Sequence, residues 1–340
     1  MAVPNTDVIS VIIPTFNRRA FLKRAVESVL AEDRVALVLH IFDNASTDGT
    51  EAYARQLEAQ DPRVTYVRRP DNVGSIANYQ LALATIDTSY FVPLADDDWL
   101  LPDFLFDAHA ILKMHPEVGA AVFVAEHRDE QDSLLGTYPT PLDQFHFGLL
   151  QPREHLTDWM RHSHYMWSSV LWRQETLACV GAPYMRTGLP SDVDFQGQIF
   201  SRYPVYLVDR PGAVFLSHAA QSSIGYDVST VSSWALLFRR LDRSVRRQKL
   251  FSKGEYRQLR QVMMDRYQGT WRIPARLDMT VARRITAAAA AGFQLGDWET
   301  ARSILSVSGG PDPSDHLRSL SHQVARNLVR LFRRTRSGDT

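Results

Sequence analysis

From residue 8 onward the chain alternates short runs of β-branched residues with amphipathic stretches, and this alternation limits the folds open to it. The stretch that begins at Phe21 places apolar residues at Leu22, Ala25, Val26 and Val29, which is the spacing of one helix face. Strands that alternate with helices are typical of βαβ units and a largely parallel sheet. We therefore predict an α/β fold with a doubly wound sheet, whose strands cover residues 8–13, 36–42, 64–67, 90–94 and 118–124.

The rest of the chain has a different character. After Glu126 a polar stretch that extends to residue 153 interrupts the pattern. Strand-like runs at 166–172 and 205–208, with an edge segment at 214–216, would then complete a mixed, mostly parallel sheet flanked by helices. From Thr230 onward helical periodicity dominates, which predicts a separate, all-helical segment.

Length and charge both divide the chain in two. A chain of 340 residues, 45% of them apolar, is large enough for one sizeable core and an appended unit, so we predict an α/β domain over 1–225 and a helical domain over 226–340. The first segment holds 17 basic and 28 acidic residues, a net charge of −11, and the second holds 21 and 10, a net charge of +11. A basic helical segment can meet an acidic lipid surface, dock on its own acidic domain or join partner subunits.

Cysteine content and hydropathy predict the compartment. The single cysteine, Cys179, excludes an intramolecular disulfide framework and a zinc-thiolate cluster, and is typical of a reducing environment. The N-terminus lacks the features of a secretory signal, and no segment approaches the ~20 apolar residues of a membrane span. We expect a cytoplasmic protein. A basic amphipathic stretch over 317–331 indicates either a helix packed on the domain or a peripheral contact with the inner face of the membrane.

Three consecutive carboxylates, Asp96, Asp97 and Asp98, follow the apolar strand at 90–94 and precede Pro102. Ligands bind at the carboxyl ends of strands in an open α/β sheet, and Mg²⁺ or Mn²⁺ takes oxygen ligands there. Acidic residues also cap helix N-termini, and taken alone the triplet favours that role. The loops after the other strands therefore decide between these interpretations.

Two of these loops have side chains suited to a nucleotide. The loop after the first strand contains Pro14, Thr15, Asn17 and Arg18 but no glycine, so it lacks the fingerprint of a dinucleotide fold. Its hydroxyl, amide and guanidinium groups could instead hold a base or a diphosphate. Asp43 ends the second strand, where a carboxylate can accept hydrogen bonds from a pyrimidine N–H or a ribose hydroxyl.

The loop after the third strand contains Asn72, Gly74 and Asn78, a pattern that indicates only a turn when taken alone. Taken in order, the four loops resemble family 2 glycosyltransferases of the GT-A fold, and the resemblance is specific over residues 8–126. It implies a nucleotide-diphosphate sugar as donor, with UDP or dTDP as the nucleotide. The donor contacts that it implies, with Asp43 on the base and Asp96 near the ribose, are Pro14, Thr15, Asn17, Arg18, Asp43, Asn72, Gly74, Asn78, Asp96 and Asp97.

The resemblance also implies a divalent ion, Mn²⁺ or Mg²⁺, held by Asp98 of the acidic triplet with His218 as a further ligand. A cation on the diphosphate oxygens neutralises the charge that develops as the nucleoside diphosphate leaves. In inverting members of the family an Asp takes the proton from the acceptor. Asp192 matches that Asp, although Ser191 replaces the usual Glu; Asp194 is the alternative, and both could instead cap the helix that follows.

We therefore predict a metal-dependent, inverting enzyme that moves a single sugar to a hydroxyl or amine of a glycan, lipid-linked or small-molecule acceptor, without a nucleic-acid partner. A sugar-1-phosphate nucleotidyltransferase shares the sheet but expects a glycine- and lysine-rich loop after the first strand, which this chain lacks. A catalytically silent nucleotide-sugar-binding or scaffold protein stays open. The basic helical segment leaves a homo-oligomer open as well.

Overall fold

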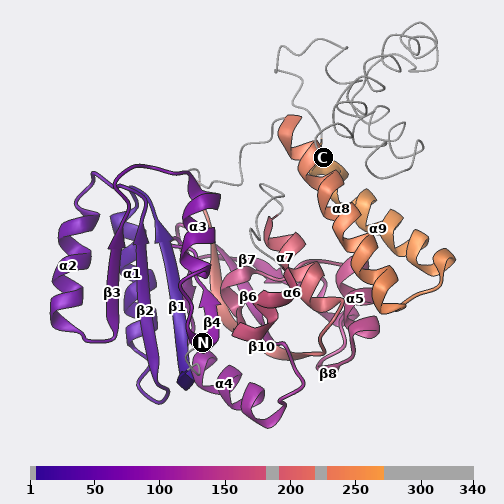
Figure 1. The fold of residues 1–340 in the computed structure, drawn as a ribbon, viewed down its shortest axis with the longest axis horizontal. Helices are drawn as coiled ribbons and strands as arrows, with labels where there is room; N and C mark the ends of the chain where they lie inside the picture. Colours follow the sequence, from indigo (N-terminus) through magenta and orange to yellow (C-terminus); the bar gives the residue numbers. More distant parts are fainter. Residues whose placement is uncertain (1–4, 181–190, 219–227, 272–340) are drawn as a thin grey trace, which may run out of the picture. The chain divides into compact units, whose positions relative to one another are not determined.

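The computed structural model describes residues 5–180, 191–218 and 228–271 (Figure 1). Its described residues form a mixed sheet flanked by helices, as the sequence pattern predicts, and this sheet has 10 strands. In the order of the main path, the strands are β3 (Val64–Arg68), β2 (Leu37–Asp43), β1 (Asn5–Thr15), β4 (Thr88–Pro93), β9 (Val170–Arg173), β6 (Ala120–Asp129), β10 (Val205–Ser217) and β5 (Trp99–Leu100). Two further strands pair beside this path, β7 (Leu134–Tyr138) with β6 and β8 (Gly148–Leu150) with β10.

The N-terminal part of the sheet is parallel and contains the point where the strand order reverses. β1 pairs with β2 on one side and with β4 on the other, and β3 extends the sheet beyond β2. The chain therefore moves outward from β1 to β3 and then returns to the opposite side of β1. In open α/β sheets the crevice that binds ligands forms at this point, outside the carboxyl ends of the strands.

The helices cover the sheet because their apolar residues recur on one face. α1 buries Leu22, Ala25, Val26 and Val29 in the same core cluster as the β1 residue Val11. β1 itself is buried on both faces, which explains why its sequence is a continuous apolar run rather than an alternating one. The helices that connect the parallel strands are α1 (Arg19–Leu30), α2 (Thr50–Gln60), α3 (Ser75–Leu83) and α4 (Phe104–Met114).

The strand expected at 166–172 is wrong in its first half. Trp167–Ser169 forms a 3₁₀ turn, and only from Val170 does the chain join the sheet, as an antiparallel strand between β4 and β6. The Ser168 hydroxyl donates a hydrogen bond to Asp98 and accepts one from the backbone N–H of Ala95. Such side-chain bonds compete with the strand ladder, which the sequence pattern does not reveal.

The runs expected as two segments, 205–208 and 214–216, belong to one strand, β10. The pairing of β10 with β6 shifts register on both sides of Pro211, because proline has no N–H for the ladder. β10 pairs with β6 along most of its length, and on its other side β5 pairs with Ala213 and Val214, so the expected edge segment at 214–216 is covered by β5 only at its first residue. The polar stretch at 127–153, which had no clear pattern, contributes the end of β6 and the strands β7 and β8.

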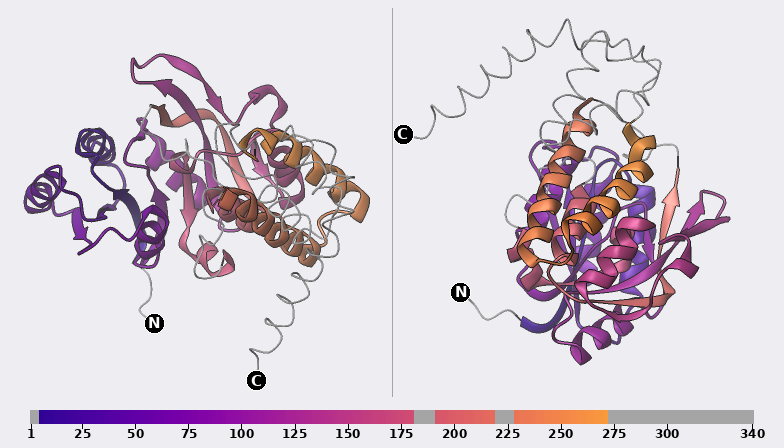
Figure 2. Two further views of the ribbon diagram at one scale, coloured as in Figure 1. Left: turned by 90° about the horizontal axis from the view of Figure 1, so that it is seen from above. Right: turned by 90° about the vertical axis from the view of Figure 1, so that its right-hand side faces the viewer.

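The remaining described elements are helical. α8 and α9 run side by side in both views of Figure 2, and the Tyr256 hydroxyl donates a hydrogen bond to Asp242 at 2.7 Å between them. Short 3₁₀ turns also occur at Leu142–Gln144 and Gln174–Thr176. The helices are α5 (Pro152–Arg161), α6 (Leu177–Val180), α7 (Ser191–Phe200), α8 (Val228–Gln248) and α9 (Lys253–Trp271).

The chain forms two compact units. One comprises Met1–Ile224 with Arg240–Met263, and the other comprises Gly225–Arg239 with Met264–Thr340. The first unit thus includes the second half of α8, and a domain boundary at residue 225 stays a prediction. The basic stretch at 317–331 lies outside the described residues. Among the helices that the structure describes, none combines the length and the apolar character needed to cross a membrane.

Candidate functional site

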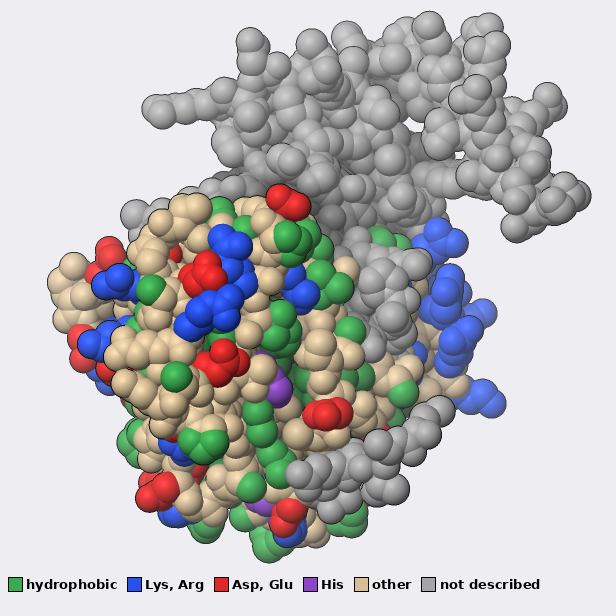
Figure 3. All heavy atoms as spheres, turned by 60° about the vertical axis from the view of Figure 1, so that its left-hand side comes forward, with side chains coloured by type: hydrophobic (Ala, Val, Ile, Leu, Met, Phe, Trp, Pro, Cys, Tyr) green, Lys and Arg blue, Asp and Glu red, His purple; other side chains and the backbone are tan. Residues whose placement is uncertain are grey.

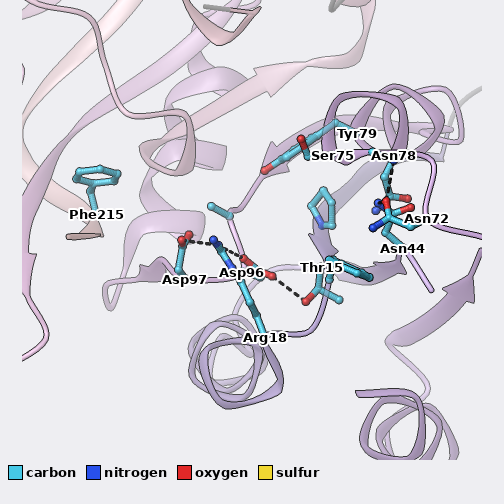
Figure 4. Close-up of a pocket in the computed structure, with 14 residues that line it drawn as sticks. Thr15, Arg18, Asn44, Asn72, Ser75, Asn78, Tyr79, Asp96, Asp97 and Phe215 are labelled. Carbon is cyan, nitrogen blue, oxygen red and sulfur yellow. Dashed lines mark hydrogen bonds and ion pairs between the residues drawn. The ribbon is translucent and has the colours of Figure 1, made fainter. Parts of the chain in front are cut away.

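A cavity of about 440 Å³ opens at the carboxyl ends of β1 and β4, where the strand order reverses. Figure 4 shows a group of asparagine side chains at one end of it, Phe215 at the other, and Arg18 with two carboxylates between them. The residues that line it are Pro14, Thr15, Phe16, Arg18, Asn44, Asn72, Gly74, Ser75, Asn78, Tyr79, Ala95, Asp96, Asp97 and Phe215.

A charged network occupies the centre of the cavity wall. Thr15 ends β1 and donates its hydroxyl to Asp96 Oδ2 at 2.7 Å. One guanidinium nitrogen of Arg18, Nη1, lies 3.1 Å from Asp96 Oδ1 and 2.7 Å from Asp97 Oδ2. The contacts join residues about 80 positions apart, because β1 and β4 are neighbours in the sheet. The cavity therefore brings together one cation and two carboxylates at the strand ends (Figure 4).

Burial shapes the titration of this network. Asp96 is 5% exposed, and burial, with the nearby Asp97 charge, raises its pKa to about 6 although Arg18 and Thr15 oppose the shift. Burial likewise raises the pKa of Asp98, again with a contribution from Asp97. Near neutral pH Asp96 is therefore a carboxylate, and the contacts with Arg18 and Thr15 favour that form.

The third carboxylate of the triplet faces away from the cavity. Asp98 is buried, its Oδ2 accepts the Ser168 hydroxyl at 2.5 Å, and its Oδ1 accepts the backbone N–H of Leu216 at 3.2 Å. It is absent from the cavity lining. The expected pair of metal ligands, Asp98 and His218, is therefore not the pair that the structure brings into contact.

His218 instead contacts Asp97. Its Nε2 lies 2.9 Å from Asp97 Oδ2, and its ring packs against Phe21 with the ring centroids 4.6 Å apart. The described residues contain no cluster of three or more His, Cys, Asp or Glu side chains that could hold a metal ion. Asp97 and His218 supply two donors, which suits an ion that completes its coordination with substrate phosphates.

The asparagine end of the cavity is a hydrogen-bonded frame. Asn44 Nδ2 donates to Asn72 Oδ1 at 2.8 Å, and Asn72 Oδ1 also accepts the N–H of Gly74. Gly74 has a φ of 84° and open space around its Cβ position, so a side chain there would be strained by the backbone rather than by contacts. Asn78 is buried and is held between the Phe42 carbonyl and a guanidinium N–H of Arg69. These two bonds hold its amide in one orientation at the edge of the cavity.

Two of the expected donor contacts, Asp43 and Asn17, do not line the cavity. Asp43 is fully buried, and its oxygens accept the Tyr66 hydroxyl at 2.6 Å and the N–H of Ser46 at 2.8 Å. Asn17 has a φ of 53° and accepts the N–H of Thr47 on its side-chain oxygen. Both residues shape the loops in this structure, and the roles expected of them in donor binding stay predictions.

Sequence reasoning missed six residues of the lining. Five of them adjoin predicted residues in the chain, so a wider window around each motif would have included them. Phe215 has no such signal, because it reaches the cavity from β10, more than a hundred residues after the acidic triplet. The missed residues are Phe16, Asn44, Ser75, Tyr79, Ala95 and Phe215.

The two candidate bases on α7 differ in their surroundings. Asp194 is fully buried, and its carboxylate pairs with Arg240 at 2.8 Å and accepts the Gln198 side-chain N–H. Asp192 is only half-buried, and burial raises its pKa to about 6 against its own backbone hydrogen bonds. Burial and then the charges of Asp96, Asp97, Asp98 and Asp192 raise the pKa of Tyr79, which lines the cavity. The charge of Asp192 therefore reaches Tyr79 on the cavity wall.

Comparison with known proteins identifies the N-terminal segment. The model of glycosyl transferase family 2 matches residues 10–172. The "GalNAc(5)-diNAcBac-PP-undecaprenol beta-1,3-glucosyltransferase" of Campylobacter jejuni is 32% identical over 94 residues, which are 27% of this chain and 30% of that protein. The abequosyltransferase RfbV of Salmonella typhimurium is 28% identical over 125 residues, 36% of each chain. The chain thus spans about a third of these two relatives.

The fold has solved counterparts. One is the crystal structure of residues 1–349 of Staphylococcus aureus TarS in complex with UDP-GlcNAc, which superposes on this chain with a TM-score of 0.66. The aligned region covers 94% of this chain and 87% of that one, and the two sequences are 14% identical. At this identity the likeness establishes a shared GT-A-like fold.

Proposed function

Because residues 10–172 form a family 2 glycosyltransferase domain, we propose that this chain transfers a sugar from a nucleotide-diphosphate donor, UDP- or dTDP-linked, to an acceptor hydroxyl or amine. The observation that carries the proposal is the network of Thr15, Arg18, Asp96 and Asp97 at the strand ends beside β1. Arg18 suits the oxygens of a diphosphate, the two carboxylates suit a cation bound beside it, and the asparagine frame suits a base and a ribose. TarS, which shares the fold, has been solved with UDP-GlcNAc and with UDP.

For the metal, we assign Asp97 and His218 in place of Asp98. Their contact at 2.9 Å and the position of Asp97 on the cavity wall support this choice, whereas Asp98 does not line the cavity. A bound Mn²⁺ or Mg²⁺ would neutralise charge on the departing diphosphate. Asp98 then has a structural task, which is to join the acidic loop to Ser168 and to β10.

For the general base, we assign Asp192 rather than Asp194. A base must be able to release and accept a proton near the operating pH, and a carboxyl with a pKa of about 6 meets that requirement. Asp194 is fully buried and paired with Arg240, so its charge is already compensated. Attack by a hydroxyl deprotonated by Asp192, opposite the departing diphosphate, would invert the anomeric carbon.

The acceptor is proposed only by class. The two relatives are named for transfer to an undecaprenol-linked glycan and for abequose transfer, which supports a glycan or lipid-linked acceptor. A peripheral contact with an anionic surface fits the hairpin of α8 and α9. Figure 3 shows Lys and Arg side chains grouped at the right-hand edge of one face, without acidic side chains among them. Six exposed cations of that hairpin make no ion pair with any residue that the structure describes: Arg243, Arg246, Arg247, Lys249, Lys253 and Arg257.

Calorimetric titration of UDP and dTDP, with and without Mn²⁺, tests the donor site. We expect wild type to bind one of them tightly only with Mn²⁺. Asp97→Asn should lose that metal-dependent gain, whereas Asp98→Asn, as the matched neighbour, should keep most of it. Loss in Asp98→Asn alone would return the metal role to Asp98. Absence of nucleotide binding by wild type under every condition would contradict the proposed function.

A further inference from the structure

The oxygen that the proposed metal would need is already engaged. Asp97 Oδ2 lies 2.7 Å from Arg18 Nη1 and 2.9 Å from His218 Nε2. The same Arg18 nitrogen reaches Asp96 Oδ1, so one guanidinium group bridges both cavity carboxylates. The Arg18 side chain is 20% exposed and lines the cavity, so it occupies the wall on which a diphosphate would lie.

A divalent ion and this guanidinium group cannot both occupy the acid pair without cost. Two cations on one carboxylate oxygen repel each other, and charges a few ångströms apart interact strongly in a partly buried site. If Arg18 leaves the pair while the cavity holds no anion, its charge loses two hydrogen-bonded partners in a partly desolvated position. In the absence of a nucleotide, the affinity for the metal is therefore lowered by the free energy needed to separate Arg18 from Asp96 and Asp97.

A nucleoside diphosphate changes this balance. Its phosphate oxygens offer Arg18 a new partner, and the planar guanidinium fork matches phosphate geometry well. Arg18 can turn without a change of fold, because it precedes α1 and its backbone carbonyl accepts the N–H of Leu22 independently of the side chain.

We propose that Arg18 is a positioning residue that occupies the metal site while no nucleotide is bound. Its guanidinium group pairs with Asp96 and Asp97 until a nucleoside diphosphate binds. It then pairs with the diphosphate instead, which frees Asp97 for the ion. Metal and nucleotide binding are thereby coupled, and the coupling must be reciprocal. This inference rests on the proposed donor site and adds the order in which its parts assemble.

The test is the affinity for Mn²⁺ alone and with saturating UDP, measured by electron paramagnetic resonance of free Mn²⁺ on the full chain. In wild type we expect UDP to tighten Mn²⁺ binding by about 10- to 100-fold. Arg18→Gln should bind Mn²⁺ alone about 5- to 10-fold more tightly than wild type, and UDP should increase its Mn²⁺ affinity by a much smaller factor than in wild type. Arg18→Lys keeps the charge and should stay close to wild type for Mn²⁺ alone. Arg19→Gln, at the exposed neighbour, should change neither value.

The metal-only titration separates this inference from the donor proposal. If Arg18→Gln binds Mn²⁺ alone no better than wild type, or if neither binds it, Arg18 does not compete with the metal and the inference fails, even where wild type binds UDP with Mn²⁺. If Mn²⁺ binding alone tightens in Arg18→Gln but UDP never binds, the competition stands and the donor proposal fails. Circular dichroism confirms that each variant is folded, and Arg18→Met repeats the test if Arg18→Gln is not.

Discussion

On α7 two carboxylates, separated by one residue, lie in surroundings that give them different chemistry. Asp194 forms an ion pair with Arg240, whereas Asp192 is half-buried. We expect Asp192→Asn to lower kcat by about 10²- to 10⁴-fold with donor affinity unchanged, because the amide cannot take the acceptor proton. Steady-state transfer assays and nucleotide titration measure the two effects. Asp209→Asn, at an exposed carboxylate of β10, is the matched control and should leave kcat within twofold.

The pH dependence of kcat should reflect the protonation of Asp192. Burial raises the pKa of Asp192 to about 6, above the ordinary value of about 3.9, so the group becomes protonated as the pH falls through 6. The protonated acid cannot act as a base, and kcat should fall about tenfold per pH unit below that point. A flat profile down to pH 5, or an equally large loss of rate in Asp209→Asn, would argue against Asp192 as the base.

Among the elements, β10 combines close packing with a direct connection to the site. A Cβ atom on Gly212 would lie 2.6 Å from Phe104 Cδ2 and 2.7 Å from Phe123 Cβ, so this strand has room only for glycine between α4 and β6. We expect Gly212→Ala to reduce the free energy of unfolding by about 1–3 kcal/mol through overpacking. Urea denaturation followed by circular dichroism measures it.

The control for this substitution lies in α9. Gly254 has no neighbour within 4 Å of its Cβ position, and helical alanine restricts the unfolded chain more than glycine does. Gly254→Ala should therefore be neutral or stabilising by up to about 1 kcal/mol. An equal loss of stability in both variants would mean that contacts with Phe104 and Phe123 are not the reason that alanine destabilises the protein at position 212.

For the whole molecule, charge distribution is the property that a partner would detect. The six cations of the α8 and α9 hairpin are exposed, and each Lys or Arg near an anionic membrane contributes about 1 kcal/mol. We expect the chain to sediment with phosphatidylglycerol vesicles at low salt but not with phosphatidylcholine vesicles. Replacing Arg243, Arg246 and Arg247 with Gln should weaken this binding by about 100-fold.

A matched triple variant removes three cations that are paired in the structure. Lys23, Arg55 and Lys113 lie beside Glu27, Glu51 and Asp7, so their replacement by Gln should weaken vesicle binding far less. If the hairpin variant binds vesicles as wild type does, the contact lies elsewhere in the chain and this surface has no role in it.

The sequence alone determined the order of the parallel strands β1 to β4 and of the helices between them, and the family that residues 10–172 match. Both depend on features local to the chain: the period of apolar residues, and polar groups placed directly after apolar strands. Eight of the ten expected donor contacts line the cavity, because parallel strands align their carboxyl ends whatever the intervening loops do.

Only the tertiary structure decided which way those side chains face. Asp97 and Asp98 are adjacent and chemically identical, yet Asp98 turns inward because Ser168 and Leu216, 70 and 118 positions away, supply its hydrogen bonds. Arg240 distinguishes Asp194 from Asp192 in the same way, and β10 brings Phe215 to the cavity. The orientation of a side chain depends on partners that are distant in the chain, and these come close only when the strands pair into the sheet.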